Sequence, residues 1–362
     1  MEIRPMADLR TQTVSRRTAL KATTAVSFGA IAPIIMGAEK KSDAKNAIVG
    51  SGEHTYECIH DWAMGNLPAG ASYGGASHGT AVDKAGMIYI SHQGKPGSIF
   101  VFDPDGKFVK SLAPQHQGQG HGIDIRDEGG TEYIYLAPSH TGMKYTKMTL
   151  HGDVVWERDR AAIQKDSGKY EGKARFRPTN CSFAPDGGYF LGDGYGSSWI
   201  HQYDKDDKYL RSIGGGGTKD GQFKTPHGQW LDQRDGTPKL VVADRANKRL
   251  QWFDMAGKHL KTLGGFLFPA DIDIQGELML VPDLHCRVTL LDKNDSVIVH
   301  LGEDAEWRKK ALHKFQMRRQ RNKWRPGLFI HPHDACFDKD GNIFIAEWVS
   351  TGRVTKLRKV GA

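Results

Sequence analysis

Between Pro226 and Gly265 the chain reads PHGQWLDQRDGTPKLVVADRANKRLQWFDMAGKHLKTLGG. Four segments of this stretch have the alternating or apolar pattern of strands, and Asp, Gly and Asn residues separate them. The predicted strands are 228–232, 239–243, 249–254 and 259–263. The Gly264-Gly265 pair permits a turn out of the last strand. About 40 residues that hold four short strands predict one blade of a β-propeller.

The same pattern recurs along the chain. Six units open at Ser77-His78-Gly79, Gly120-His121-Gly122, Pro178-Thr179-Asn180, Pro226-His227-Gly228, Pro269-Ala270-Asp271 and Pro332-His333-Asp334. Roughly 40 to 45 residues per unit is the length of a four-stranded blade, and the longer intervals hold insertions. We therefore predict an all-β fold, a six-bladed β-propeller.

The two ends of the repeat region complement each other. The last unit offers an inner strand after His333, then strands at 342–346 and 353–359, but no outermost strand. Residues 55–62 precede the first unit and have the pattern of an outermost strand without inner partners. Pairing the two would close the ring and leave no edge exposed. We expect the N-terminal strand to join the sixth blade.

The formal net charge of +8 is concentrated in one segment. Nine Lys and Arg residues stand against three Asp and Glu residues between Glu303 and Arg325, and the remainder is nearly neutral. This distribution and the lack of nucleic-acid motifs predict no nucleic-acid partner. The basic insertion, at about 303–326, is predicted to be helical over 305–323 and to lie on the face that carries the histidines. It is either a solvated helix packed on the ring or a positive lid that attracts anions.

The N-terminus carries Arg16-Arg17 ahead of an apolar stretch at 22–35. Paired arginines before a moderately apolar segment are typical of a twin-arginine export signal, and the stretch is too short for a stable membrane span. We assign 1–38 to the signal, 39–54 to a linker and 55–362 to the propeller. The predicted location is the periplasm or the cell exterior, as a monomer with no integral membrane span after signal removal.

Four cysteines are widely spaced and form no CxxC pair: Cys58, Cys181, Cys286 and Cys336. A structural zinc module is therefore not expected. Cys181 and Cys336 fall in predicted inner strands of opposite blades, so we expect buried free thiols there.

Histidines open four of the six inner strands, at His78, His121, His227 and His333. Blades two, four and six supply His121, His227 and His333, which would point at the axis about 120° apart. Zinc accepts three His nitrogens and keeps an open position in catalytic sites. We predict a metal site on these three residues, while His78 and His92 enlarge the histidine cluster as an additional site. Loops of the same face contribute Gln93, Tyr195, Arg245 and Trp348.

Several of these segments resemble a known family of NHL-repeat propellers, the peptidylglycine amidating lyases. The similarity is strongest in Phe176-Arg177-Pro178-Thr179, Asp193-Gly194-Tyr195, Gly221-Gln222-Phe223 with Pro226-His227, Val242-Ala243-Asp244-Arg245 and Pro332-His333-Asp334. The resemblance implies zinc on His121, His227 and His333, a catalytic Tyr195 and an essential Arg245. It also implies a structural calcium ion on Asp334 and the backbone carbonyl of Ile123.

The implied reaction splits a peptidyl α-hydroxyglycine into a peptide amide and glyoxylate. Zinc on the substrate hydroxyl would lower its pKa, and a tyrosine can act as the base if a cation such as Arg245 stabilises its phenolate. Arg245 can alternatively hold the substrate carboxylate by a two-pronged hydrogen bond. The chain departs from the family at Gln93, where the family has a second arginine, and at Gly196, where it has a cysteine.

Three functions follow from these observations. The first is an exported metal-dependent lyase that takes a small-molecule or peptide substrate. The second is a non-catalytic NHL propeller that binds a protein, peptide or glycan. The third is a metal-dependent, lactonase-like hydrolase, which fits less well because calcium lactonases use carboxylate and Asn ligands rather than imidazoles.

Overall fold

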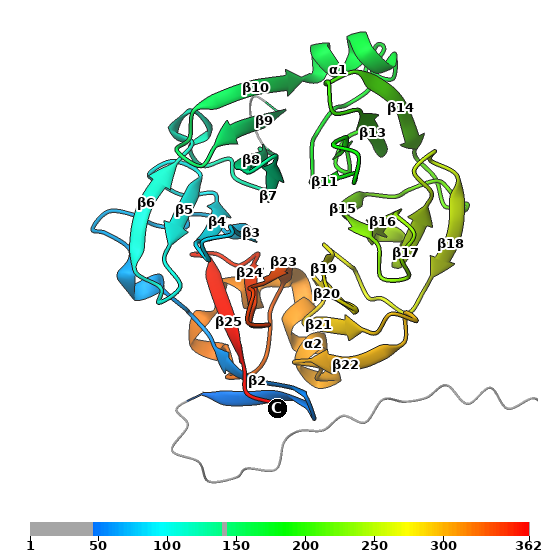
Figure 1. Cartoon of the computed structure of the whole chain (residues 1–362). Coiled ribbons are helices and arrows are strands. Elements are labelled where there is room, and N and C mark those ends of the chain that lie inside the picture. The colour runs from blue at the N-terminus through cyan, green and yellow to red at the C-terminus, as the bar shows by residue number, and fades with distance from the viewer. Residues whose placement is uncertain (1–45, 140–142, 362) are drawn as a thin grey trace, which may run out of the picture. The chain divides into compact units, whose positions relative to one another are not determined.

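The computed structural model describes residues 46–139 and 143–361. These residues form six antiparallel sheets arranged radially around a centre, as Figure 1 shows. Each sheet presents one strand to the centre, and these innermost strands are β3, β7, β11, β15, β19 and β23. The prediction of a six-bladed β-propeller is confirmed.

Five blades have four strands each. Blade 1 holds β3 (Ser77–Val82), β4 (Ile88–His92), β5 (Ile99–Phe102) and β6 (Phe108–Leu112). Blade 2 holds β7 (Gly122–Glu128), β8 (Thr131–Ala137), β9 (Lys144–Thr149) and β10 (Val154–Asp159). Blade 3 holds β11 (Cys181–Phe183), β12 (Tyr189–Gly192), β13 (Trp199–Tyr203) and β14 (Tyr209–Gly214). Blade 4 holds β15 (Pro226–Asp232), β16 (Lys239–Asp244), β17 (Arg249–Phe253) and β18 (His259–Leu263). Blade 5 holds β19 (Asp273–Gln275), β20 (Leu278–Asp283), β21 (Arg287–Leu291) and β22 (Val297–Leu301).

Blade 6 joins the two ends of the described chain. It consists of β23 (Pro332–Phe337), β24 (Ile343–Glu347), β25 (Arg353–Lys359), β2 (His54–Ile59) and β1 (Ala47–Ser51). Tyr56 pairs with Lys359 and Ile59 with Lys356, so the N-terminal strand completes the last blade as expected. The sheet continues beyond that strand, because β1 pairs antiparallel with β2. Ala47–Ser51 had been assigned to the linker 39–54, and the export signal at 1–38 lies outside the described residues.

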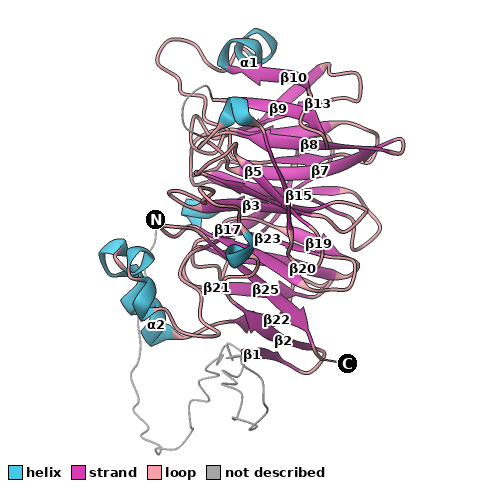
Figure 2. Cartoon of the chain, turned by 90° about the vertical axis from the view of Figure 1, so that its left-hand side faces the viewer, coloured by secondary structure: helices cyan, strands magenta, loops and turns pink. Residues whose placement is uncertain are grey.

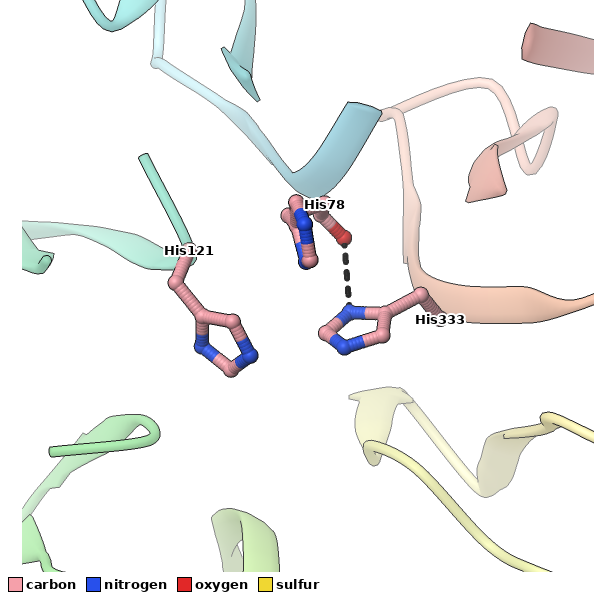
Figure 3. A group of neighbouring side chains, drawn as sticks. All are labelled: His78, His121 and His333. Carbon is pink, nitrogen blue, oxygen red and sulfur yellow. Dashed lines mark hydrogen bonds between the residues drawn. The ribbon is translucent and has the colours of Figure 1, made fainter. Parts of the chain in front are cut away.

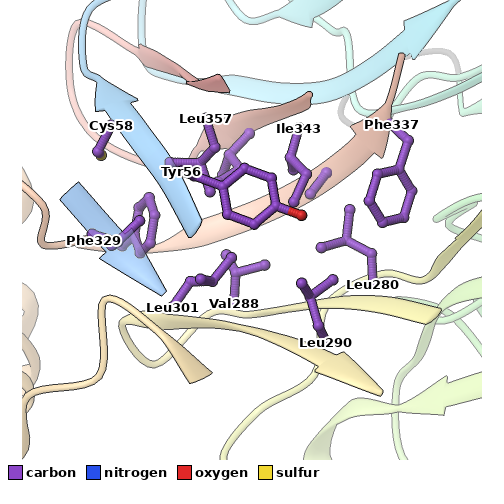
Figure 4. Packing of buried hydrophobic residues seen from close by; sticks show 13 residues of the cluster. Tyr56, Cys58, Leu280, Val288, Leu290, Leu301, Phe329, Phe337, Ile343 and Leu357 are labelled. Carbon is purple, nitrogen blue, oxygen red and sulfur yellow. The ribbon is translucent and has the colours of Figure 1, made fainter. Parts of the chain in front are cut away.

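The hydrophobic core is divided among the interfaces between neighbouring blades. Figure 4 shows the interface of blades 5 and 6, where Leu280 and Val288 pack with Ile343, Leu357 and the closing strand's Tyr56. Comparable buried clusters fill the other five interfaces. Both faces of a blade are therefore covered by its neighbours, which explains continuous apolar runs such as Leu240 to Ala243 in β16.

Two insertions carry the helices. α1 (Arg160–Ser167) follows β10, and Asp159 caps its first turn by accepting from the Ala162 backbone N–H. α2 (Ala305–Leu312) follows β22, is capped by Asp304, and lies outside the stack of strands in Figure 2. The basic insertion was expected to be helical over 305–323, but α2 ends at Leu312 and short 3₁₀ turns follow. Lys314 and Phe315 have left-handed backbone angles, which an α-helix does not admit.

The four cysteines are buried and free, as expected for Cys181 and Cys336. Within the described part of the chain, no helix has the length and apolar character needed to cross a membrane.

Ring closure generates a stability prediction. Leu357 is fully buried in β25 between the closing strand and blade 5, so Leu357→Ala should lower the free energy of unfolding by about 2–5 kcal/mol. Leu260→Ala on the outermost strand β18, where the side chain is 45% exposed, is the matched control. It should change the free energy by less than about 0.5 kcal/mol. Urea denaturation followed by circular dichroism measures both, and equal midpoints for the two variants would contradict the closure argument.

Candidate metal and substrate site

Four imidazole rings gather at the centre of the ring of blades. The ring centroids of His121, His227 and His333 lie 4.7–5.0 Å apart in every pairing. His78 is the fourth, 4.6 Å from the His333 ring and 4.9 Å from the His121 ring. The structure therefore brings together the three predicted ligands and adds His78, one of the two residues assigned to an additional site.

Local backbone structure turns these histidines inward. In blades 1, 4 and 6 the pairing of the innermost strand with the second strand is irregular at His78, His227 and His333. The register shifts there, between Ser77 and Thr80, between Pro226 and Gln229, and between Pro332 and Asp334. Such bulges re-aim side chains.

The glycine after a histidine lets neighbouring inner strands approach closely. A Cβ atom on Gly228 would lie 2.0 Å from Asp271 Oδ1, and one on Gly122 would lie 2.1 Å from the Thr179 carbonyl oxygen. The His-Gly pairs of the sequence thus serve both the packing of the inner strands and the placement of the rings.

A backbone carbonyl of the following blade fixes the orientation of each predicted ligand. Nδ1 of His121 lies 3.0 Å from the Thr179 carbonyl oxygen, Nδ1 of His227 lies 2.6 Å from that of Ala270, and Nδ1 of His333 lies 3.1 Å from that of His78. Figure 3 shows the last of these bonds. A carbonyl only accepts, so Nδ1 donates and Nε2 of the neutral ring keeps its lone pair. This is the orientation found in metal-ligating histidines.

Two of the rings, those of His227 and His333, are held in the neutral form that a metal ligand requires. Burial lowers the pKa of His227 and of His333 well below the usual imidazole value. The Arg245 guanidinium lowers the pKa of His227 further, and the imidazoles of His78 and His227 do the same for His333. Neutral imidazoles are therefore available to a cation at physiological pH.

One set of three histidines has ligand atoms close enough to share one ion, and the set predicted from the sequence overlaps with it. Single ligand nitrogens of His78, His121 and His333 lie within 4.8 Å of one another, and Figure 3 shows these three residues. The other set replaces His78 by His227, whose Nε2 lies 2.9 Å from the Tyr195 hydroxyl oxygen. His121 and His333 belong to both sets.

Tyr195 and Arg245 lie beside the histidines, as the sequence predicted. The Tyr195 hydroxyl oxygen is 3.3 Å from His121 Nε2, and Arg245 donates to it across 3.3 Å. The Arg245 guanidinium also lies over the Tyr195 ring, 5.0 Å from its centroid. One hydroxyl thus contacts two of the predicted ligands and a cation.

Buried aspartates hold the loops that carry these two residues. Asp193 accepts from the backbone N–H of Arg177 at 2.5 Å and of Ser197 at 2.6 Å, and from the Tyr170 hydroxyl at 2.9 Å. Burial raises the pKa of Asp193 to about 7. Asp244 accepts from the Lys224 backbone N–H and from Arg249 Nε, each at 2.7 Å. Each aspartate joins its loop to the segment that leads into the inner strand.

The loops and inner strands enclose a cavity of about 620 Å³. It is lined by three of the histidines, His78, His121 and His333, and by the polar residues Gln93, Ser139, Arg177, Tyr195 and Arg245. The rest of its lining is mainly apolar and aromatic: Phe268, Leu284, His285, Phe315 and Trp348. The two kinds of residue adjoin, since the Arg245 guanidinium lies 5.1 Å from the Phe268 ring centroid. The basic insertion contributes Phe315, so it does reach the face that carries the histidines.

His92 lies away from the cavity, although it had been grouped with His78. Its side chain is fully buried in blade 1, where the ring stacks on Phe100 with 3.7 Å between centroids. His92 Nδ1 accepts from the Gly94 backbone N–H at 3.0 Å. The neighbouring Gln93 lines the cavity instead.

A layer of buried carboxyl groups lies near the inner strands. Asp334 is 4% exposed, and burial together with Asp271 and Asp124 raises its pKa well above the usual value. Asn180 donates to both carboxylate oxygens of Asp271 at 3.1 Å. Ile123 is buried in β7 and pairs with Leu136. Asp334 therefore has two acidic neighbours, Asp271 and Asp124.

Gly196, where the amidating lyases have a cysteine, stands in a crowded part of its loop. A Cβ atom there would lie 2.0 Å from Asp193 Oδ1 and 2.4 Å from the Arg175 carbonyl oxygen. The loop as folded has no room for a cysteine.

Six residues that line the cavity were not predicted to belong to the site, namely Ser139, Arg177, Phe268, Leu284, His285 and Phe315. Arg177 precedes Pro178 at the opening of the third unit. Its position next to the start of an inner strand could have identified it as a cavity residue. Phe268 stands in the same relation to the fifth unit.

No family model and no curated protein matches the sequence. Solved structures share the fold. Virginiamycin B lyase from Staphylococcus aureus aligns with a TM-score of 0.52 at 13% identity, over 79% of this chain and 96% of that chain. A gluconolactonase from Xanthomonas campestris aligns with a TM-score of 0.56 at 12% identity, over 86% and 98%. A luciferin-regenerating enzyme aligns with a TM-score of 0.53 at 10% identity, over 84% and 96%.

At these identities the likeness shows the fold alone. The chain is a six-bladed β-propeller whose structural neighbours include lyase and lactonase enzymes.

The packing of His92 predicts a pH dependence. Burial lowers its pKa to about 3 from 6.5, so between these values the unfolded chain binds a proton that the folded protein does not. This contribution to stability is lost as the pH falls below 6.5, and the loss amounts to about 3 kcal/mol by about pH 4.5. His92→Phe should therefore flatten the acid side of the stability profile measured by urea denaturation. His151→Phe, at an exposed position, is the control, and parallel profiles for His92→Phe and wild type would refute this account.

Proposed function

We propose that the protein is an exported, metal-dependent lyase that cleaves a peptidyl α-hydroxyglycine or a closely similar α-hydroxyamide. The observation that supports this most directly is the Tyr195 hydroxyl, which lies within hydrogen-bond distance of the His121 and His227 imidazoles and of the Arg245 guanidinium. A potential base, a potential metal site and a cation thus adjoin one cavity.

The histidine geometry fits zinc. A zinc–nitrogen bond of about 2.0–2.1 Å places ligand ring centroids about 5 Å apart at tetrahedral angles. The three centroid distances of His121, His227 and His333 are 4.7–5.0 Å. The carbonyl partner of each Nδ1 also fits a ligand set. Zinc held by these residues would act as a Lewis acid towards a substrate oxygen.

The chain's own residues account for the movement of protons. The reaction breaks the substrate O–H and C–N bonds, forms the aldehyde C=O bond, and leaves a proton on the departing amide nitrogen. Tyr195, as a phenolate stabilised by Arg245, would take the hydroxyl proton and return it to that nitrogen. The products are a primary amide and glyoxylate, so atoms and charge balance without a redox partner.

A second ion is proposed in a structural role. Calcium on Asp334 and the Ile123 carbonyl oxygen would neutralise carboxyl groups that are crowded in a buried layer. The proposal rests on the acidic surroundings of Asp334 and does not affect the reaction at Tyr195.

Metal content tests the ligand assignment. Protein purified with zinc should carry about one ion per chain, and His227→Ala should lower zinc affinity by at least about 100-fold, more than the loss of a residue that only supports a ligand. His201→Ala is the matched control, because that imidazole is equally buried but bonds to Tyr170 and Ser212 inside blade 3.

Elemental analysis and zinc titration measure both variants. A parallel His78→Ala variant decides between the two sets of ligands. Loss of zinc from His78→Ala but not from His227→Ala would assign the ion to His78, His121 and His333 instead.

Turnover tests the role of the tyrosine. Tyr195→Phe should lower kcat for glyoxylate release from a peptidyl α-hydroxyglycine by about 100- to 10,000-fold, because the group that transfers the proton is removed. Bound zinc should remain. Tyr209→Phe removes a hydroxyl that bonds to Ser212 in β14 and should leave kcat unchanged. Wild-type turnover in Tyr195→Phe, or no glyoxylate from the zinc-loaded wild type, would refute the lyase.

A binding module without catalysis is the alternative on the same fold. It predicts that Tyr195→Phe and zinc removal leave ligand binding unchanged. A lactonase-like hydrolase, in line with the gluconolactonase among the structural neighbours, predicts lactone hydrolysis instead of glyoxylate release.

A further inference from the structure

Two guanidinium groups adjoin the cavity without an acidic partner among the described residues. Arg245 is 7% exposed, and its Nε has no hydrogen-bond partner there. Arg177 donates to the Ser139 carbonyl oxygen at 3.2 Å and lies 5.8 Å from the Tyr195 ring centroid. The described residues that line the cavity include no Asp or Glu. Because a buried charge is costly unless it is paired, this arrangement points to an anionic ligand.

Arg177 supplies a second cation beside Tyr195. Gln93 lines the cavity from the blade 1 loop and carries no charge. Arg177 enters from the opening of blade 3, where Asp193 fixes its backbone N–H. Both arginines contact the same tyrosine ring, so one carboxylate beside Tyr195 can be reached by both.

Apolar and aromatic residues line the cavity next to the arginines. Phe268 stacks on His285 with centroids 4.7 Å apart, and the Arg318 guanidinium covers Trp348 at 3.3 Å. Phe315 lies 6.5 Å from Trp348 and is 42% exposed, although it is a large hydrophobic residue that lines a cavity.

Phe315 is also held in a strained conformation. Its φ of 52° and that of Lys314, 50°, are both in the left-handed region. This backbone keeps the aromatic ring half-exposed at the cavity, where a ligand can cover it.

We propose that the substrate is an amphipathic anion. Its carboxylate lies between Arg177 and Arg245, and an apolar substituent packs on Phe268, Phe315 and Trp348. This inference rests on the proposed function only for the location of the reacting bond, since the anion and apolar subsites are defined by residues other than the histidines. A cavity of about 620 Å³ is large enough for a ligand of this kind.

Three matched probes separate the two subsites: 3-phenylpropanoate, its neutral amide 3-phenylpropanamide, and propanoate, which lacks the ring. Calorimetry on the wild-type protein should show 3-phenylpropanoate binding at least about tenfold more tightly than either of the others. Arg177→Gln should remove most of the preference for the acid over the amide. Phe315→Ala should remove most of the preference for the probe that carries the ring.

Arg175→Gln and Val297→Ala are the controls. Arg175 is an exposed arginine two residues from Arg177, and Val297 is a 43% exposed hydrophobic residue of the outermost strand β22. Both should bind like wild type. Equal affinity for acid and amide, no binding of 3-phenylpropanoate at about 10 mM, or equal effects of Arg177→Gln and Arg175→Gln would overturn the proposal.

The same titration in His227→Ala separates this inference from the lyase. If glyoxylate release is absent but the acid is still preferred and Arg177→Gln abolishes that preference, the lyase fails and the anion site stands. If glyoxylate is released but acid and amide bind equally, the anion site fails and the lyase stands.

Discussion

Acidic side chains at the ends of second strands hold the cavity face of this propeller together. Asp193, Asp244, Asp283 and Glu347 end β12, β16, β20 and β24 or follow them directly, and each is buried. Asp283 accepts from the Leu267 and Phe268 backbone N–H groups, and Glu347 from that of Ile330. Each carboxylate ties its loop to the segment that leads into the inner strand of the same blade. The side chains that follow, including Tyr195, Arg245 and Trp348, are thereby presented to the cavity.

The same position explains His92. It ends β4 in blade 1, and its Nδ1 accepts from Gly94 as a carboxylate would. The His92 imidazole therefore stabilises the loop of blade 1, whereas the next residue, Gln93, lines the cavity. Hydrogen bonds between neighbouring blades also orient the predicted ligands. The imidazoles of His121, His227 and His333, in blades 2, 4 and 6, bond to backbone carbonyls of blades 3, 5 and 1. The odd-numbered blades thus supply the carbonyl groups that orient the histidines of the even-numbered blades.

Most of the fold was predictable from local patterns. The strands of blade 4 match those expected to within two residues at each end, because the apolar runs and turn residues of 226–265 leave little choice. β1 was missed, since Ala47–Ser51 is short and mostly half-buried, and only its pairing with β2 makes it a strand. The basic insertion was expected to be helical over its length, yet composition alone did not indicate the left-handed residues Lys314 and Phe315.

The part of the candidate site that lies at equivalent positions of the repeat could be predicted from the sequence. Ring symmetry placed His121, His227 and His333 together, and loop position placed Tyr195 and Arg245 beside them. The position of Arg177 depends on which loops of different blades lie side by side, and the sequence of a single repeat does not show that.

The pairing of β2 with β25 also affects synthesis on the ribosome. Blade 6 takes strands from both ends of the described chain, so it cannot assemble until the residues up to Lys359 have emerged, and an early stop codon would leave the other five blades as an open arc.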